Sequence, residues 1–284
     1  MSYYFMFVIL FFVGAYFEDA YKKKELPHFF KASGVLALAA VVGVCINISN
    51  LYHTYEYSKE TMRGKSELKQ EGAAASQTSS GLDRDYITNW SYGIGETLTL
   101  LVPNVKGGGS GSTMSQSEAA MAKANPMYNG IYSQLPQYFG EQPWTAGPVY
   151  VGAFVMFLFV LGCFIVKGPL KWALLGATIF SILLSWGKNF MGLTDFFIDY
   201  VPMYNKFRAV SSILVIAEFT IPLLAIFALK EILSKPDMLK QEKNCRGVIA
   251  ALVLTAGVAL ILAVAPGTFF SSFITAQEMT ALKQ

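Results

Sequence analysis

Charged residues, cysteine and histidine are all scarce in this chain. Charged side chains make up 14% of the 284 residues and apolar ones 54%, whereas a soluble domain carries roughly 25% charged residues. This composition indicates a membrane protein. The three cysteines and two histidines follow no ligand or disulfide spacing, so we expect no metal and no cofactor. The net charge of +3 gives no reason to expect a nucleic-acid partner.

The chain contains several long apolar runs in which charged residues are nearly absent. A helix needs roughly 20 apolar residues to cross a bilayer core of about 30 Å, whereas barrel strands alternate over about ten residues. Because the runs are continuous, we predict an all-α membrane protein: a polytopic helical bundle of about six transmembrane helices with a large, partly ordered outer loop. The runs cover residues 3–17, 29–51, 149–166, 170–186, 209–229 and 248–265.

Lysine marks one side of the predicted membrane protein. Short loops rich in lysine and arginine face the cytoplasm under the positive-inside rule. Applied here, the rule places the N-terminus, the long loop and the C-terminal tail outside. The predicted cytoplasmic connections hold Lys22, Lys23, Lys24 and Lys31, then Lys167 and Lys171, then Lys230, Lys235, Lys240, Lys243 and Arg246.

This topology divides the chain into four parts. Residues 1–52 hold the first two transmembrane helices, 53–147 an extracytoplasmic loop region, 148–265 four transmembrane helices and 266–284 an outer tail. The first apolar run is short, so we expect the chain to begin inside a helix of a longer protein; a genuine short helix is the alternative. The sequence GGGSGS at 107–112 resembles an engineered linker, and a native glycine-rich turn is the alternative.

Cationic residues near the second outer loop are the first site candidates. Lys188, Lys206 and Arg208 lie there among aromatic residues. Such cations bind phosphate through charge-assisted hydrogen bonds, and aromatic neighbours suit a site that is wet at one end and apolar at the other. We therefore predict a lipid-phosphate site. The alternative is that the three cations contact headgroups or pair with Asp195 and Asp199.

Buried or clustered carboxylates are the other candidates. Glu218 lies well inside the fifth apolar run, where an ionisable group costs roughly 3 kcal/mol and is by default a functional hypothesis; a role in helix packing is the alternative. In the long loop, Glu56, Arg63 and Glu96 are polar candidates. Carboxylates of this kind act as bases or electrostatic stabilisers, and a solvated surface is the alternative interpretation.

Several motifs spread over the whole chain resemble the outer-loop signature of the YfhO family of bacterial membrane proteins, most closely its Bacteroidota branch. Members of that family are much longer, so the chain resembles a central portion of one. The motifs are TYEYS (54–58), RGKSEL (63–68), WSYG (90–93) with Glu96, PN (103–104), QP (142–143), GPVY (147–150), SWGKN (185–189) and PMYNKFR (202–208).

The resemblance implies a multi-pass protein of the bacterial inner membrane, similar to the GT-C class of glycosyltransferases. Its partners would be membrane lipids, a polyprenyl-phosphate sugar and a cell-surface polymer acceptor. In that class the catalytic acid usually lies in the first outer loop. No outer loop precedes the first helix here, so no catalytic residue is assigned. The competing functions are a transporter or lipid flippase and a non-catalytic envelope scaffold.

Overall fold

The chain folds into a helical bundle with a long irregular connection. The structure, a computed structural model, describes residues 2–61 and 82–270, with side chains from residue 6 onward. Within those ranges it contains α-helices, short 3-10 helices, a π-helical turn at Val253–Gly257 and no strand, which confirms the predicted all-α class. The α-helices are α1 (Ser2–Lys23), α2 (Leu26–Ile46), α3 (Ile48–Lys59), α4 (Arg84–Thr88), α5 (Glu118–Met121), α6 (Asn129–Tyr132), α7 (Ala153–Ile165), α8 (Pro169–Ser185), α9 (Met191–Tyr200), α10 (Val215–Ser234), α11 (Glu242–Leu252) and α12 (Val258–Val264).

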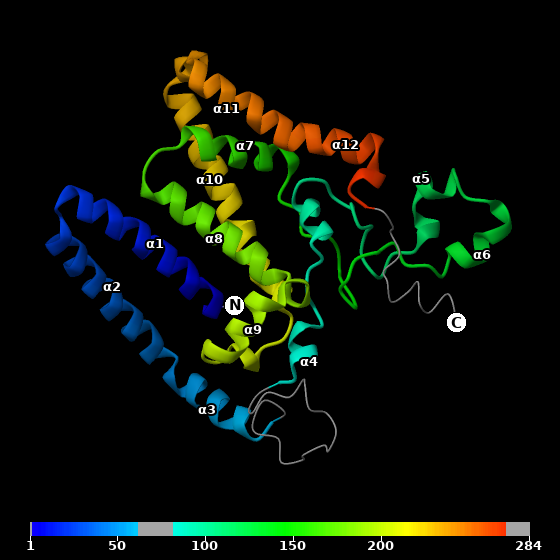
Figure 1. Cartoon of the computed structure of the whole chain (residues 1–284). Helices are drawn as coiled ribbons and strands as arrows, with labels where there is room; N and C mark the ends of the chain where they lie inside the picture. Colours follow the sequence, from blue (N-terminus) through cyan, green and yellow to red (C-terminus); the bar gives the residue numbers. More distant parts are fainter. Residues whose placement is uncertain (1, 62–81, 271–284) are drawn as a thin grey trace.

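The core of the bundle lies between α7, α8 and α10. Helix α10 packs on both α7 and α8, α11 packs on α7, and α1 packs on α8 (Figure 1). Leu161, Leu174 and Leu224 come from the three central helices and are almost fully buried. The buried hydroxyls of Thr178 and Thr220 bond across α8 and α10 at 2.7 Å. Such interhelical hydrogen bonds stabilise helix contacts where water is absent.

Among the residues that the structure describes, the helices that could cross a membrane are fewer than the six apolar runs. Three are long and apolar enough, Leu26–Ile46, Val210–Ser234 and Glu242–Val264, and a fourth would be the pair Pro169–Ser185 and Gly187–Tyr200, which is bent by 108°. The run at 149–166 falls short because its helix, α7, has only 13 residues. The backbone at Gly152 has φ +102°, so the helix begins only after that glycine. These helices are those of a multi-pass membrane protein.

Positively charged connections gather at one end of the bundle. Figure 1 shows the α1–α2, α7–α8 and α10–α11 turns on the same side, while α4 and α9 lie toward the opposite end. The turns carry the predicted cytoplasmic lysines, including Lys23, Lys167 and Lys240. The arrangement is the one that the positive-inside rule needs, and the side of the membrane that each end faces stays a prediction.

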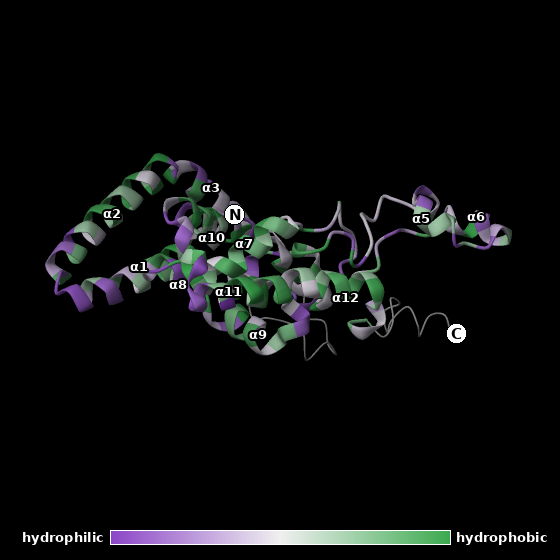
Figure 2. Ribbon diagram, turned by 90° about the horizontal axis from the view of Figure 1, so that it is seen from above, coloured by the Kyte–Doolittle hydropathy of each residue, from purple (hydrophilic) through white to green (hydrophobic). Residues whose placement is uncertain are grey.

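Helix α2 is apolar on every side and packs mainly against α1. None of its residues is buried, and Figure 2 shows the middle of its ribbon mostly in the colours of hydrophobic residues. A helix that is apolar all round is normally buried in a large core or in a bilayer. Because no other element described by the structure covers α2, lipid is the environment that its sequence suits.

The glycine-rich segment at 107–112 is a packed turn. Residues 105–114 run beside 135–146, joined by hydrogen bonds from Gln137 N to Ser112 O (2.8 Å) and from Ser110 N to Thr145 O (2.9 Å). A Cβ at Gly107 would lie 1.6 Å from the Gln137 carbonyl oxygen, and one at Gly109 would lie 2.5 Å from that of Ala146. Of the two interpretations of GGGSGS, the structure favours the glycine-rich turn. The turn supports the lobe that holds α5 and α6, which projects away from the bundle (Figures 1 and 2).

Substituting Gly107 should therefore open this lobe. Gly107 has φ +84° and no room for a Cβ, whereas a Cβ at Gly111 meets nothing within 4 Å. We expect Gly107→Ala to increase amide hydrogen exchange across 105–146 and to leave the exchange of α8 and α10 unchanged, because the lobe contacts the bundle little. Gly111→Ala is the matched control. Equal exchange in the two variants would contradict the packed turn.

Candidate functional site

Lys188 and Arg208, two of the three predicted cations, each contact one short segment of the long connection, residues 86–91. Residues 90–92 are bonded on both sides: Tyr92 N donates to Ser185 O (2.8 Å), and Ser211 N donates to Trp90 O (3.1 Å). The segment therefore joins the end of α8 to the stretch that follows Arg208, and Lys188 lies in the 3-10 helix Gly187–Phe190 just after α8. The hydrogen bonds here join residues that lie between 54 and 122 positions apart in the sequence. Only the tertiary fold brings such residues together.

Arg208 is held by aromatic rings. Its guanidinium carbon lies 5.3 Å from the centroid of the Trp90 ring and 5.6 Å from that of Tyr86. Its Nη1 donates to the Tyr86 hydroxyl at 2.7 Å. Tyr86 lies on α4 and Trp90 lies two residues after its end, and both rings contact the guanidinium of Arg208. Cation–π contact orients the guanidinium while the side chain stays exposed to solvent.

Lys188 lies next to the same segment. Its backbone N–H donates to Ser91 Oγ at 2.8 Å, and its exposed Nζ donates to the Glu141 carbonyl at 3.4 Å. This close approach depends on Gly187, which has φ +47°. A Cβ there would lie 2.1 Å from Ser91 Oγ. Lys188 and Arg208 thus both contact this stretch of the chain, and their joint role in a phosphate site stays a prediction.

Lys206 has a different neighbourhood. It ends the 3-10 helix Tyr204–Lys206 and is half-buried. The preceding residue, Asn205, accepts a backbone hydrogen bond from Leu82 at 3.0 Å. The loop is bracketed by Met203 and Ala209, whose φ values of +66° and +63° are uncommon for residues with a Cβ. Strained backbone of this kind clusters at functional sites.

Asp195 and Asp199 both pair with Arg84, which is not one of the three predicted cations. Arg84 Nη1 bonds to Asp195 Oδ1, and its Nη2 bonds to Asp199 Oδ1 at 2.6 Å. The two carboxylates lie four residues apart on α9, so one guanidinium reaches both. Arg84 was not among the predicted site residues, although the spacing of the two aspartates on a helix was a usable signal for a cationic partner. The pairing leaves Lys188 and Arg208 free of these acids.

Glu96 is a buried structural acceptor. Its side chain is 3% exposed and accepts hydrogen bonds from Gly93 N (2.6 Å), Tyr138 Oη (2.5 Å) and Glu141 N (3.3 Å). Burial first, and then the hydrogen bond to Glu96, raises the pKa of Tyr138 above its ordinary value, so its hydroxyl remains a donor. Glu96 therefore fixes the backbone at Glu141, whose carbonyl accepts from Lys188. The alternative of a solvated surface residue is wrong for Glu96.

Glu218, which lies well inside the fifth apolar run of the sequence, is exposed on the surface of the bundle. It occupies the first turn of α10, where Ile216, Ala217 and Thr220 turn inward and are fully buried. Successive helical residues point about 100° apart, so Glu218 faces outward.

Burial raises the pKa of the nearby Tyr92 hydroxyl to about 12, and the charges of Glu96 and Glu218 add to this effect. Tyr92 is therefore a neutral phenol at physiological pH.

The remaining predicted site residues either lie away from Lys188 and Arg208 or lie outside the described residues. Glu56 is exposed on α3 and forms a local ion pair with Lys59 at 2.7 Å, which is a solvated surface arrangement. Arg63 lies outside the described residues. In the parts of the chain that the structure describes, no group of three or more histidine, cysteine, aspartate or glutamate side chains could hold a metal ion.

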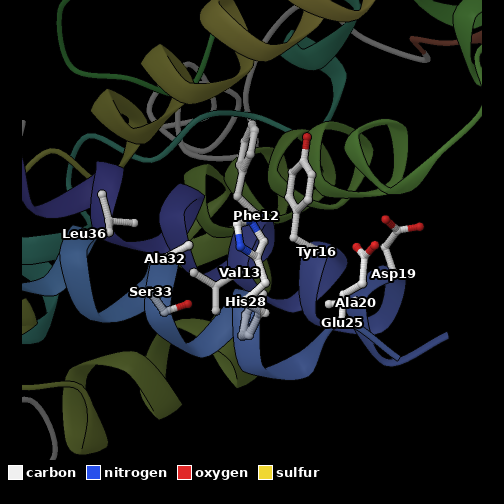
Figure 3. A pocket seen from close by; sticks show the side chains of 11 residues that line it. Phe12, Val13, Tyr16, Asp19, Ala20, Glu25, His28, Ala32, Ser33 and Leu36 are labelled. Atoms are coloured by element: carbon white, nitrogen blue, oxygen red, sulfur yellow. The ribbon is translucent and has the colours of Figure 1, made fainter. Parts of the chain in front are cut away.

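A groove between α1 and α2 is a separate feature. It has a volume of about 340 Å³. Figure 3 shows Leu36 and Ala32 toward one end and Asp19 and Glu25 toward the other. Asp19 is paired with Lys23 at 2.6 Å. The groove contains none of the predicted site residues.

Comparison of the chain with models of protein families, with curated proteins and with solved structures finds no match. The family resemblance therefore rests on the quoted motifs alone. What the structure establishes is an all-α chain, over the residues that it describes, with three or four helices long and apolar enough to cross a membrane.

Proposed function

We propose that this chain is the lipid-phosphate-binding part of a GT-C-like membrane glycosyltransferase. Such an enzyme transfers a sugar from a polyprenyl phosphate to a cell-surface polymer in the bacterial envelope. The observation that carries the proposal is the setting of Arg208, which is oriented by two rings, exposed and not paired with Asp195 or Asp199. Lys188 supplies a second, exposed ammonium, and its backbone N–H bonds to Ser91.

The chemistry of the cluster suits a phosphate at the end of an apolar chain. A guanidinium presents planar donors that match phosphate oxygens, and an ammonium adds charge without fixed geometry. The aromatic rings provide apolar surface next to the charges. A diphosphate head would use both Lys188 and Arg208, and Lys206 on the same loop is the third candidate. We assign no residue of this chain as the catalytic acid of the sugar transfer.

Replacing Arg208 tests the site. We expect Arg208→Ala to weaken binding of polyprenyl phosphate in nanodiscs by roughly 1.5–3 kcal/mol, about ten- to a hundredfold, because a charged hydrogen bond is lost. Arg208→Lys should be only partly tolerated, since an ammonium lacks the planar fork. Arg246→Ala is the matched control, because this arginine is exposed at the start of α11 and paired with Glu242. Unchanged binding by a folded Arg208→Ala protein would make Arg208 an interfacial anchor only.

A lipid flippase is the second candidate function, and the bent pair of α8 and α9 is the observation that favours it. Discontinuous helices often form the substrate sites of transporters. The two functions differ in a vesicle assay. A flippase moves a labelled lipid phosphate between leaflets without an acceptor, whereas a glycosyltransferase consumes the sugar-loaded lipid only when an acceptor is present.

A further inference from the structure

Helix α9 turns sharply away from α8. The two helices are bent by 108° at the break around Gly187. If α8 runs across the membrane, α9 lies roughly along its surface. A helix in that position buries one face in protein and offers another to the boundary between headgroups and acyl chains.

The surface of α9 is divided into three faces. Thr194, Phe197 and Ile198 are buried against the bundle. Asp195 and Asp199 form the second face, where Arg84 binds both carboxylates. The third face carries Phe196 and Tyr200, which are 53% and 75% exposed. Their rings pack on each other with centroids 5.3 Å apart.

Further exposed apolar side chains lie next to both ends of the helix in the chain. Phe190 precedes α9, and Met203 and Phe207 follow it; all three are exposed. Large apolar side chains gathered around one exposed element are uncommon on a soluble surface and mark an interaction site. Because Arg84 binds the two carboxylates of α9, little net negative charge opposes contact with an apolar or anionic surface.

We propose that α9 lies in the membrane–water interface, with Phe196 and Tyr200 inserted at the level of the lipid headgroups. The occupant of this face is the bilayer itself. Phenylalanine and tyrosine suit that depth, and tyrosine is enriched there because its ring is apolar and its hydroxyl is wet. Lys188 and Lys206 lie just before and just after α9 in the chain, where ammonium groups would meet anionic headgroups. The proposal concerns the bilayer and holds whether or not the protein transfers sugar.

Spin labels measure this placement directly. The full chain, with Cys45, Cys163 and Cys245 replaced by serine, would carry Phe196→Cys or Tyr200→Cys and be reconstituted in vesicles of phosphatidylethanolamine and phosphatidylglycerol. Collision with oxygen reports lipid, and collision with a water-soluble nickel complex reports water. Met127→Cys, on the projecting lobe at an 82% exposed site, is the aqueous control, and Val42→Cys on α2 is the lipid control.

We expect the labels at 196 and 200 to collide with oxygen nearly as often as the label at 42. Their collision rate with the nickel complex should be several-fold lower than that of the label at 127. A nickel rate equal to that at 127 would show that α9 faces water. Protection from both reagents would show that protein covers this face. Either result overturns the proposal.

Discussion

Gly187→Ala is expected to destabilise the protein by about 2–4 kcal/mol, from strain at a left-handed backbone and from overpacking. The new Cβ would lie 2.1 Å from Ser91 Oγ and 2.5 Å from Val210 Cγ2. Ser91 lies in the segment that bonds to Lys188, and Val210 lies two residues after Arg208. The substitution should therefore separate residues 90–92 from the end of α8 and weaken lipid-phosphate binding as well as stability.

Thermal unfolding in detergent measures the effect of Gly187→Ala. A loss of this size lowers the unfolding midpoint by roughly 5–10 °C for a chain of this length. The control is Gly192→Ala, because a Cβ at Gly192 on α9 meets nothing within 4 Å. That change should be neutral or slightly stabilising, since alanine favours helix over glycine. Equal midpoints for the two variants would show that the contact at Gly187 does not restrict the fold.

Glu96→Ala is expected to destabilise the long connection by about 3–5 kcal/mol. The substitution removes the acceptor for Gly93 N, Tyr138 Oη and Glu141 N at once. Each buried donor left without a partner costs about 1–3 kcal/mol, although the donors that reach water after a local rearrangement cost less. Because the backbone at Glu141 accepts from Lys188, we also expect weaker lipid-phosphate binding.

Two further variants separate the parts of this effect. Glu141→Ala removes an exposed carboxylate from the same region but keeps the backbone hydrogen bonds, so it should leave the unfolding midpoint nearly unchanged. Tyr138→Phe removes only one of the donors and should have an intermediate effect. If Glu96→Ala unfolded at the same temperature as Glu141→Ala, Glu96 would have no structural role.

The candidate site could be predicted only in part. The sequence indicated Lys188, Arg208 and Glu96 as candidate site residues, because charged residues are few among the apolar runs. It did not indicate what each of them contacts. Arg84 and Asp195 are 111 residues apart, and Arg208 and Tyr86 are 122 apart, and no local pattern encodes pairs at such separations.

By itself, the sequence determined the class of the fold. Continuous apolar runs have to bond their backbone groups internally when water is absent, and helices do this within one segment. Lysine placement likewise determined which turns share an end of the bundle. These properties depend on composition and on neighbours within a few residues, so they can be deduced without tertiary contacts.

Only the tertiary structure decided how long the helices are, which way their side chains face and what the glycines do. Gly152 shortens α7, Glu218 points outward because its neighbours fill the core, and the glycine-rich stretch at 107–112 packs against 137–146. Each outcome depends on atoms brought close by folding. A positive φ or a missing Cβ has a consequence only when another segment occupies the space beside it.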